Sequence, residues 1–187
     1  MPQTTHILDS NVYGELMVDH AGAKIIRTVK EDKRLYVYGL DVIRKELMAV
    51  PVSLEDRGRL IRKSVLSIYE AVVDEELSLP PLAAYLASEY FEEFRRLREL
   101  NRYKKAVGVR ELSKLRKLTG ADLLVDFQIV ATASLIGADI VVSMDARTIL
   151  SPVAADAYGE VNAENKLRTP ALLRYSDFRA KYLRGGK

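Results

Sequence analysis

The segment His6-Ile7-Leu8-Asp9-Ser10-Asn11 joins a short apolar run to a cluster of turn-forming and helix-capping residues. Such a junction is typical of a strand followed by a tight turn and a helix. Two further runs, Leu35-Tyr36-Val37-Tyr38 and Ile140-Val141-Val142-Ser143, also have the composition of strands. Because these apolar runs alternate with helical patterns, the sequence predicts an α/β fold with a central parallel sheet flanked by helices.

The middle of the chain carries an extended helical segment. Leu54 to Val73 and Pro81 to Leu100 both have amphipathic patterns, and the two prolines at 80–81 separate them. A chain of 187 residues is long enough for one good-sized core. We therefore predict a single domain over residues 1–187, with a helical insertion or dimerisation arm at about 54–100.

The composition excludes several classes of protein. The chain has no Cys, which rules out disulfides, thiolate metal sites and cysteine nucleophiles. It has no apolar run of the length that a membrane span needs, and its first residues lack the pattern of a signal peptide. We expect a cytoplasmic protein with no membrane partner.

Four acidic side chains occupy positions that a solvated surface acid would not favour. Asp9 and Asp145 lie at or just beyond the ends of predicted strands, where parallel α/β sheets place their ligands. Glu46 and Asp126 lie on the apolar faces of predicted helices. Each position also has a structural explanation, because Asp9 and Asp145 can cap helices and Glu46 can pair with a buried Arg.

A divalent cation would explain the four acids as one group. Unpaired buried carboxylates are costly, and several close together are difficult to ionise. Hard cations such as Mg²⁺ and Mn²⁺ prefer oxygen ligands, and carboxylate-held cations suit the hydrolysis of phosphodiesters. The chain has only two His, which makes a His-based zinc site improbable, and it lacks a P-loop and a GxGxxG motif.

The pattern resembles the PIN-domain nucleases, including the VapC-type toxins of toxin–antitoxin pairs. The segments that carry the resemblance are Ile7-Leu8-Asp9-Ser10-Asn11-Val12, Ile43-Arg44-Lys45-Glu46-Leu47, Asp126-Phe127-Gln128-Ile129-Val130-Ala131-Thr132-Ala133 and Ile140-Val141-Val142-Ser143-Met144-Asp145. The resemblance implies a PIN-like parallel sheet and cleavage of RNA that depends on Mg²⁺ or Mn²⁺. It also implies an antitoxin partner and a homodimer.

The resemblance also assigns roles to individual residues. Asp9, Glu46, Asp126 and Asp145 would be the catalytic residues that bind the metal, and Asn11 and Ser143 would be polar groups near the first and fourth acids. The chain departs from the toxins in its long helices at about 54–100 and in having Ser143 where Thr is commoner. Because no further acid follows closely after Asp145, the number of metal ions stays open.

The net charge of +3 is unevenly distributed. Residues 95–117 contain ten Lys or Arg and two acids, a local charge of +8, and the rest of the chain therefore carries −5. A basic helix is predicted over 110–118 in this stretch. An acidic pole and a basic pole suit an anionic polymer held near a cation site, although a solvated helical face would have the same composition. The candidate nucleic-acid-binding residues are Arg102, Lys104, Lys105, Arg110, Lys114 and Lys117.

Two alternatives to a ribonuclease remain at this point. A phosphatase whose nucleophile is an Asp at a strand end would carry a D-x-D motif after its first strand. In this chain Asn11 occupies the position of the second Asp. A catalytically inert PIN-like module would use the basic stretch to bind RNA or protein. The sequence also leaves open whether a ribonuclease would act as a toxin or in RNA processing.

Overall fold

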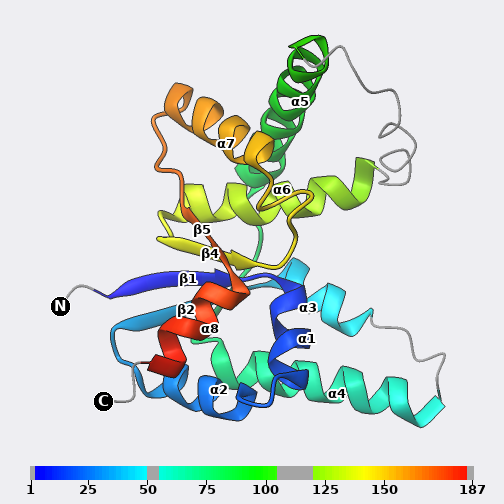
Figure 1. The fold of residues 1–187 in the computed structure, drawn as a ribbon, viewed down its shortest axis with the longest axis vertical. Coiled ribbons are helices and arrows are strands. Elements are labelled where there is room, and N and C mark those ends of the chain that lie inside the picture. The colour runs from blue at the N-terminus through cyan, green and yellow to red at the C-terminus, as the bar shows by residue number, and fades with distance from the viewer. Residues whose placement is uncertain (1–2, 50–54, 105–119, 185–187) are drawn as a thin grey trace. The chain divides into compact units, whose positions relative to one another are not determined.

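The computed structural model describes residues 3–49, 55–104 and 120–184, and Figure 1 shows the course of the chain. Side chains are not described at 55–57, 101–104, 120–123 and 183–184. The elements in chain order are β1 (Thr4–Leu8), α1 (Ser10–Val18), α2 (Gly22–Glu31), β2 (Leu35–Leu40), α3 (Asp41–Met48), α4 (Glu55–Val72), β3 (Glu75–Leu77), α5 (Pro81–Lys104), α6 (Gly120–Ile136), β4 (Ile140–Ser143), α7 (Pro152–Glu164), β5 (Ala171–Arg174) and α8 (Tyr175–Arg184).

These elements fall into two compact units. The first unit comprises Met1–Leu79, Ala138–Met144 and Pro170–Lys187, and it holds the sheet with α1, α2, α3, α4 and α8. The second unit comprises Pro80–Gly137 and Asp145–Thr169, and it holds α5, α6 and α7. The two long helices of the predicted arm therefore belong to different units, and the predictions of a single domain and of a dimerisation arm stay predictions.

Five strands among the described residues form one sheet, in the order β3-β2-β1-β4-β5, and every neighbouring pair is parallel. β1 lies in the centre, with Leu8 opposite Val142 of β4. The chain leaves β1 toward β2 on one side and later enters β4 on the other. The strand order therefore reverses between β1 and β4, which is where open parallel sheets bind ligands at the carboxyl ends of their strands.

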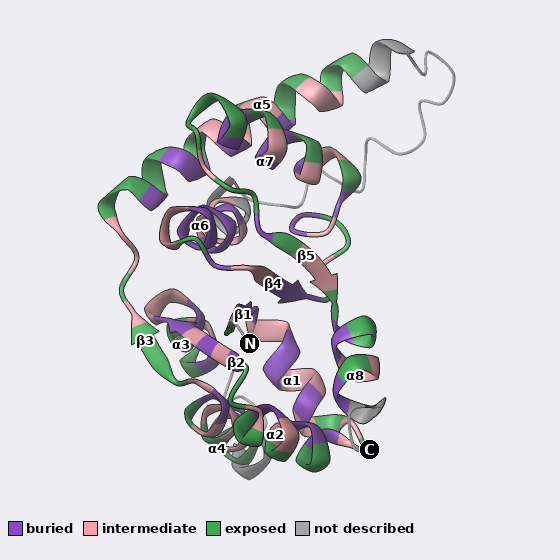
Figure 2. Ribbon diagram, turned by 90° about the vertical axis from the view of Figure 1, so that its left-hand side faces the viewer, coloured by how far each residue is buried: buried purple, intermediate pink, exposed green. Residues whose placement is uncertain are grey.

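The strands follow from their apolar side chains. Ile7, Leu8, Val141 and Val142 are fully buried, so the two central strands form the core of the first unit. The edge strand β5 is more exposed, and Figure 2 shows this contrast between β4 and β5. The close approach of α4 to β2 requires a glycine, because a Cβ on Gly39 would lie 2.2 Å from the hydroxyl oxygen of Tyr69.

The second unit is built on the nearly all-apolar helix α6. α6 packs against α5, and α5 packs against α7. Phe127 of α6 contacts Phe94 of α5 and Tyr158 of α7, with ring centroids 5.6 Å and 5.8 Å apart. α6 ends at Ile136, and the next residue, Gly137, has a φ of 70°, the left-handed conformation that glycine adopts without strain after a helix.

The structure confirms the predicted α/β class and the parallel sheet with flanking helices. It adds one strand that the sequence pattern did not indicate, the short edge strand β3 between the two long helices. The predicted helix over 110–118 lies outside the described residues. No described helix is both long enough and apolar enough to span a membrane.

Candidate functional site

Asp9 lies at the carboxyl end of the central strand β1 and begins helix α1 as its N-cap. Its Oδ1 accepts a 2.7 Å hydrogen bond from the backbone N–H of Ser10. Its Oδ2 accepts hydrogen bonds of 2.6 Å from the Asn11 side-chain amide and 2.7 Å from the Ser143 hydroxyl. Asp9 is only 3% exposed, so these donors stabilise a carboxylate that burial alone would disfavour.

The Asn11 side chain connects the ends of the two central strands. Its amide nitrogen donates to Asp9, and its Oδ1 accepts a 3.0 Å hydrogen bond from the backbone N–H of Met144, directly after β4. The Asn11 amide also lies 3.4 Å from the Ser143 hydroxyl oxygen. Both ends of the amide are therefore engaged, and the Asp9 carboxylate is held in one orientation at the point where the strand order reverses.

A buried tyrosine lies behind this group. Burial raises the pKa of the Tyr13 hydroxyl well above its usual value, and electrostatic coupling to the nearby Tyr69 and Asp9 side chains raises it further. The Tyr13 hydroxyl has no hydrogen-bond partner within the part of the chain that the structure describes. Tyr13 therefore remains a neutral phenol, and its ring packs against that of Tyr69, with centroids 5.2 Å apart.

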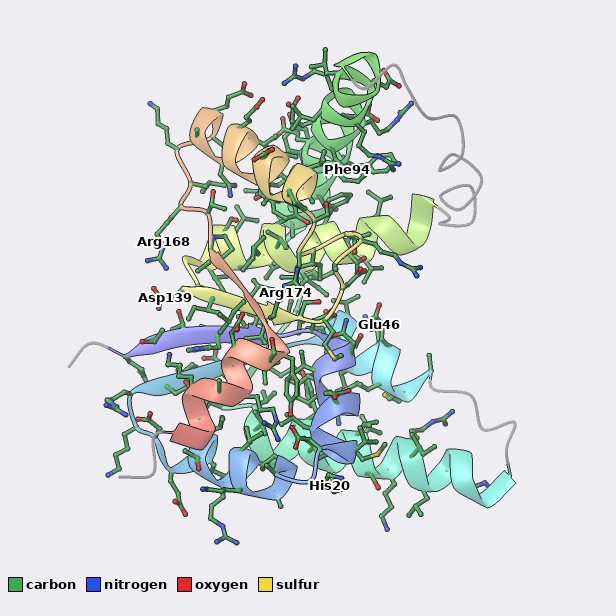
Figure 3. All side chains as sticks on the ribbon, in the orientation of Figure 1. His20, Glu46, Phe94, Asp139, Arg168 and Arg174 are labelled. Carbon is green, nitrogen blue, oxygen red and sulfur yellow. The ribbon has the colours of Figure 1, made fainter. Side chains whose placement is uncertain are left out.

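Glu46 belongs to the same unit, on helix α3, and Figure 3 labels it there. Its neighbours Ile43 and Leu47 are buried, whereas Arg44 and Lys45 are exposed. Glu46 itself is half-buried, at the boundary of the two faces. The sequence pattern placed Glu46 on a buried face, and the structure corrects this to a position that solvent partly reaches.

Asp126 and Asp145 lie together in the second unit, joined by a residue that the sequence analysis did not single out. The Thr148 hydroxyl forms a 2.5 Å hydrogen bond with Oδ2 of Asp126 and a second, short hydrogen bond with Oδ2 of Asp145. Asp145 Oδ1 also accepts from the backbone N–H groups of Arg147, at 2.7 Å, and Thr148, at 3.2 Å. Asp145 thus caps a turn rather than a helix, because the next helix begins at Pro152.

This acidic pair borders the aromatic core of the second unit. Burial raises the pKa of the Tyr158 hydroxyl well above its usual value, and electrostatic coupling to the nearby Asp126, Tyr90 and Asp145 side chains adds to the effect. The Tyr158 hydroxyl is buried and has no hydrogen-bond partner among the described residues. Asp126 is half-buried rather than on a fully buried face.

The four predicted acids are therefore divided equally between the units. Asp9 and Glu46 lie in the first, and Asp126 and Asp145 lie in the second. Within residues 3–49, 55–104 and 120–184, no cluster of three or more His, Cys, Asp or Glu side chains has a geometry that would hold a metal ion. The predicted four-residue cation site stays a prediction.

The chemistry of the donors nevertheless fits a hard divalent cation. All four predicted ligands are carboxylates, which Mg²⁺ and Mn²⁺ prefer. The Thr148 hydroxyl carries one proton, so it can donate to only one of the two carboxylates at a time. The hydroxyl oxygen then meets the second carboxylate oxygen without a proton between them. A nearby cation would stabilise these two adjacent oxygen atoms.

The remaining predicted residues differ in how far the structure describes them. Asn11 and Ser143 both donate hydrogen bonds to the Asp9 carboxylate. Arg102 and Lys104 lie in the last turn of α5, where side chains are not described. Lys105, Arg110, Lys114 and Lys117 lie outside the described residues. Thr148 had only one signal in the sequence, its position three residues after a candidate ligand at the end of a strand.

No protein-family model and no curated protein matches the chain. Two solved structures have a similar course of the backbone. The structure of VapBC2 from Rickettsia felis bound to a DNA fragment from their promoter aligns with a TM-score of 0.48 and 10% identity, covering 91% of this chain and 98% of the matched chain. The structure of FitAB bound to the IR36 DNA fragment aligns with a TM-score of 0.49 and 15% identity, covering 91% and 94%.

Proposed function

We propose that the chain is an endoribonuclease that depends on Mg²⁺ or Mn²⁺ and hydrolyses RNA phosphodiester bonds. The observation that carries this proposal is the pairing of Asp126 with Asp145 around one buried hydroxyl. Two carboxylates from separate segments share this single donor, and a cation would offset the repulsion between them. The resemblance of the sequence to PIN-domain nucleases adds Asp9 and Glu46 to the same proposed set of ligands.

Each residue of the set has a separate task in this proposal. Asp9, Glu46, Asp126 and Asp145 supply oxygen ligands, and Asn11 and Ser143 hold the Asp9 carboxylate in one orientation. When bound, the cation would polarise the phosphodiester and lower the pKa of water, so that hydrolysis proceeds near neutral pH. Of these proposed ligands, Asp9 lies at the carboxyl end of β1, Glu46 lies on α3, and Asp126 and Asp145 lie in the second unit.

RNA binding is proposed to use the basic stretch of residues 95–117. Arg102, Lys104, Lys105, Arg110, Lys114 and Lys117 would contact the phosphate backbone. Binding would then weaken as salt rises, because each neutralised phosphate releases condensed counterions. A measurement of RNA affinity against salt concentration tests this, since Lys114→Ala and Lys117→Ala should each reduce the slope by about 0.7 for single-stranded RNA.

An antitoxin partner, a homodimer and a cytoplasmic location complete the proposal, and these rest on the sequence resemblance and composition alone. Copurification with the product of a neighbouring reading frame would support a toxin. Retention of RNA cleavage without any such partner in the genome would favour RNA processing instead.

Three assays on the purified protein separate this function from its alternatives. The ribonuclease should cut RNA with Mg²⁺ or Mn²⁺ and lose the activity in EDTA. A strand-end Asp phosphatase would instead release phosphate from small phosphoesters. An inert module would bind no Mn²⁺ at millimolar concentration in calorimetry and would leave the RNA intact.

A further inference from the structure

Thr148 occupies an unusual position between two candidate ligands. It lies in the turn that follows Asp145 and is only 1% exposed. Its hydroxyl contacts Oδ2 of Asp126, on α6, and Oδ2 of Asp145, in the loop after β4. Its backbone N–H donates to the other oxygen of Asp145. Thr148 therefore connects two acids that are 19 positions apart in the sequence.

The geometry of Thr148 is fixed by both its chemistry and its surroundings. A β-branched side chain has few accessible rotamers, and burial restricts them further. Each carboxylate oxygen lies within 2.5 Å of the same hydroxyl oxygen, so the two oxygens are no more than about 5 Å apart. Two oxygen ligands of one Mg²⁺ ion each lie about 2.0–2.1 Å from the ion, so the distance between them is shorter than this limit.

We propose that Thr148 is a positioning residue that sets the Asp126 and Asp145 carboxylates at the spacing required to bind one divalent cation. The proposal rests on the proposed function and extends it to a residue outside the predicted set of ligands. Without the hydroxyl, the two like charges would repel each other and separate in the cation-free protein. The cation would then have to bring them together again on binding, which lowers its affinity.

Aromatic side chains lie next to the Asp126 and Asp145 carboxylates that Thr148 contacts. Tyr158 lies close enough to both carboxylates for their charges to raise its pKa, and its hydroxyl has no hydrogen-bond partner in the described residues. The Tyr158 ring packs on Phe127, in the turn of α6 directly after Asp126. Asp126 therefore adjoins packed aromatic side chains, and Thr148, in the turn after Asp145, contacts both carboxylates.

The test is calorimetry of Mn²⁺ binding to the full chain without RNA. Thr148→Val removes the hydroxyl and keeps the shape, and we expect it to weaken Mn²⁺ affinity about 10- to 100-fold. Thr148→Ser restores a hydroxyl and should recover the wild-type affinity. Thr132→Val is the matched control, because Thr132 is an equally buried threonine of α6 whose hydroxyl donates to the Gln128 carbonyl, at 2.8 Å. This control should leave Mn²⁺ affinity unchanged.

The outcomes distinguish this inference from the proposed function. Wild-type protein that binds Mn²⁺ and cuts RNA, together with an unchanged affinity in Thr148→Val, would overturn the role of Thr148 alone. Wild-type protein that neither binds Mn²⁺ nor cuts RNA would overturn the proposed function and this inference with it. If Thr148→Val does not fold, as judged by circular dichroism, Thr148→Ala replaces it and must show the same loss of affinity.

Discussion

The Ser143 hydroxyl donates a 2.7 Å hydrogen bond to Oδ2 of Asp9, across 134 positions of sequence. The bond joins the ends of the two central strands, because β1 and β4 are neighbours in the sheet. Both residues are almost completely buried. The pairing of β1 with β4 therefore brings the Ser143 hydroxyl to a carboxylate that lies near the start of the sequence.

Removing this donor should destabilise the first unit. In Ser143→Ala, a buried carboxylate loses one of its hydrogen bonds, and we expect the free energy of unfolding to fall by about 1.5–3 kcal/mol. Urea unfolding of the metal-free protein measures this change. Ser143→Thr retains the hydroxyl and serves as the control, with most of the wild-type stability. Equal stabilities of the Ala and Thr variants would show that the hydrogen bond contributes nothing.

Two buried tyrosines in the second unit should respond differently to loss of the hydroxyl. Tyr90 donates a 2.6 Å hydrogen bond to Oδ1 of Asn162 and lies 3.1 Å from the Ser134 hydroxyl, all within the core. Tyr90→Phe leaves the Asn162 carbonyl without this donor, and we expect a loss of about 1–3 kcal/mol.

Tyr158→Phe is the matched control for this substitution. The two rings are in contact, with centroids 4.9 Å apart, but the Tyr158 hydroxyl has no hydrogen-bond partner in the described part of the chain. We therefore expect Tyr158→Phe to change stability by less than about 0.5 kcal/mol or to increase it. Thermal unfolding of both variants provides the comparison, and a larger loss in Tyr158→Phe than in Tyr90→Phe would contradict the hydrogen bonding seen here.

His6 should make the protein less stable in mild acid. Burial lowers the pKa of His6 to about 4, the Thr4 carbonyl and Asp139 oppose this shift, and Lys181 adds to it. In the unfolded chain the pKa of histidine is about 6.5, so the unfolded state binds more protons between pH 4 and 6.5. The stability that the buried, neutral His6 gives the folded state is therefore complete above pH 6.5. It is lost as the pH falls toward 4, with a total loss on the order of 3 kcal/mol in the free energy of unfolding.

Urea unfolding between pH 5 and 7 tests this prediction. His6→Leu is expected to remove most of the pH dependence in that range, because the buried group can no longer take up a proton. The exposed His20 provides the control. His20→Gln leaves the buried histidine in place and should retain the wild-type slope. A His6→Leu variant whose slope matches the wild type would assign the acid sensitivity to other groups.

The central strands could be predicted from the sequence because their side chains determine their structure locally. Ile140, Val141 and Val142 form an apolar, β-branched run with no helical alternative of comparable length. β3 could not be predicted, because Glu75 and Glu76 are poor strand formers and the strand depends on pairing with β2. Tyr36 supports this edge by donating to Glu75, at 3.0 Å, a contact that only the folded chain creates.

The sequence pattern selects four candidate acids, whose role stays a prediction, but it could not predict the contacts around them. Asp9 follows an apolar run, so its position at a strand end was evident, but its near-complete burial and its donors depend on β4. Thr148 could not be identified because a single threonine in a turn has no periodic pattern. Glu46 and Asp126 are half-buried rather than buried. The sequence could not predict this, because helical periodicity gives the direction in which a side chain points and not how deeply it is buried.

The most direct test of the central claim is RNA cleavage by Asp126→Asn in the presence of Mn²⁺. The amide keeps the size of the side chain and an oxygen that can accept from Thr148, but it removes the charge that the proposed cation requires. We predict that cleavage falls by at least about 100-fold, as expected for loss of a ligand that stabilises transition-state charge, while the circular dichroism spectrum and melting temperature stay close to those of the wild type. Asp9→Asn and Asp145→Asn should behave in the same way. Full ribonuclease activity in folded Asp126→Asn would contradict the account.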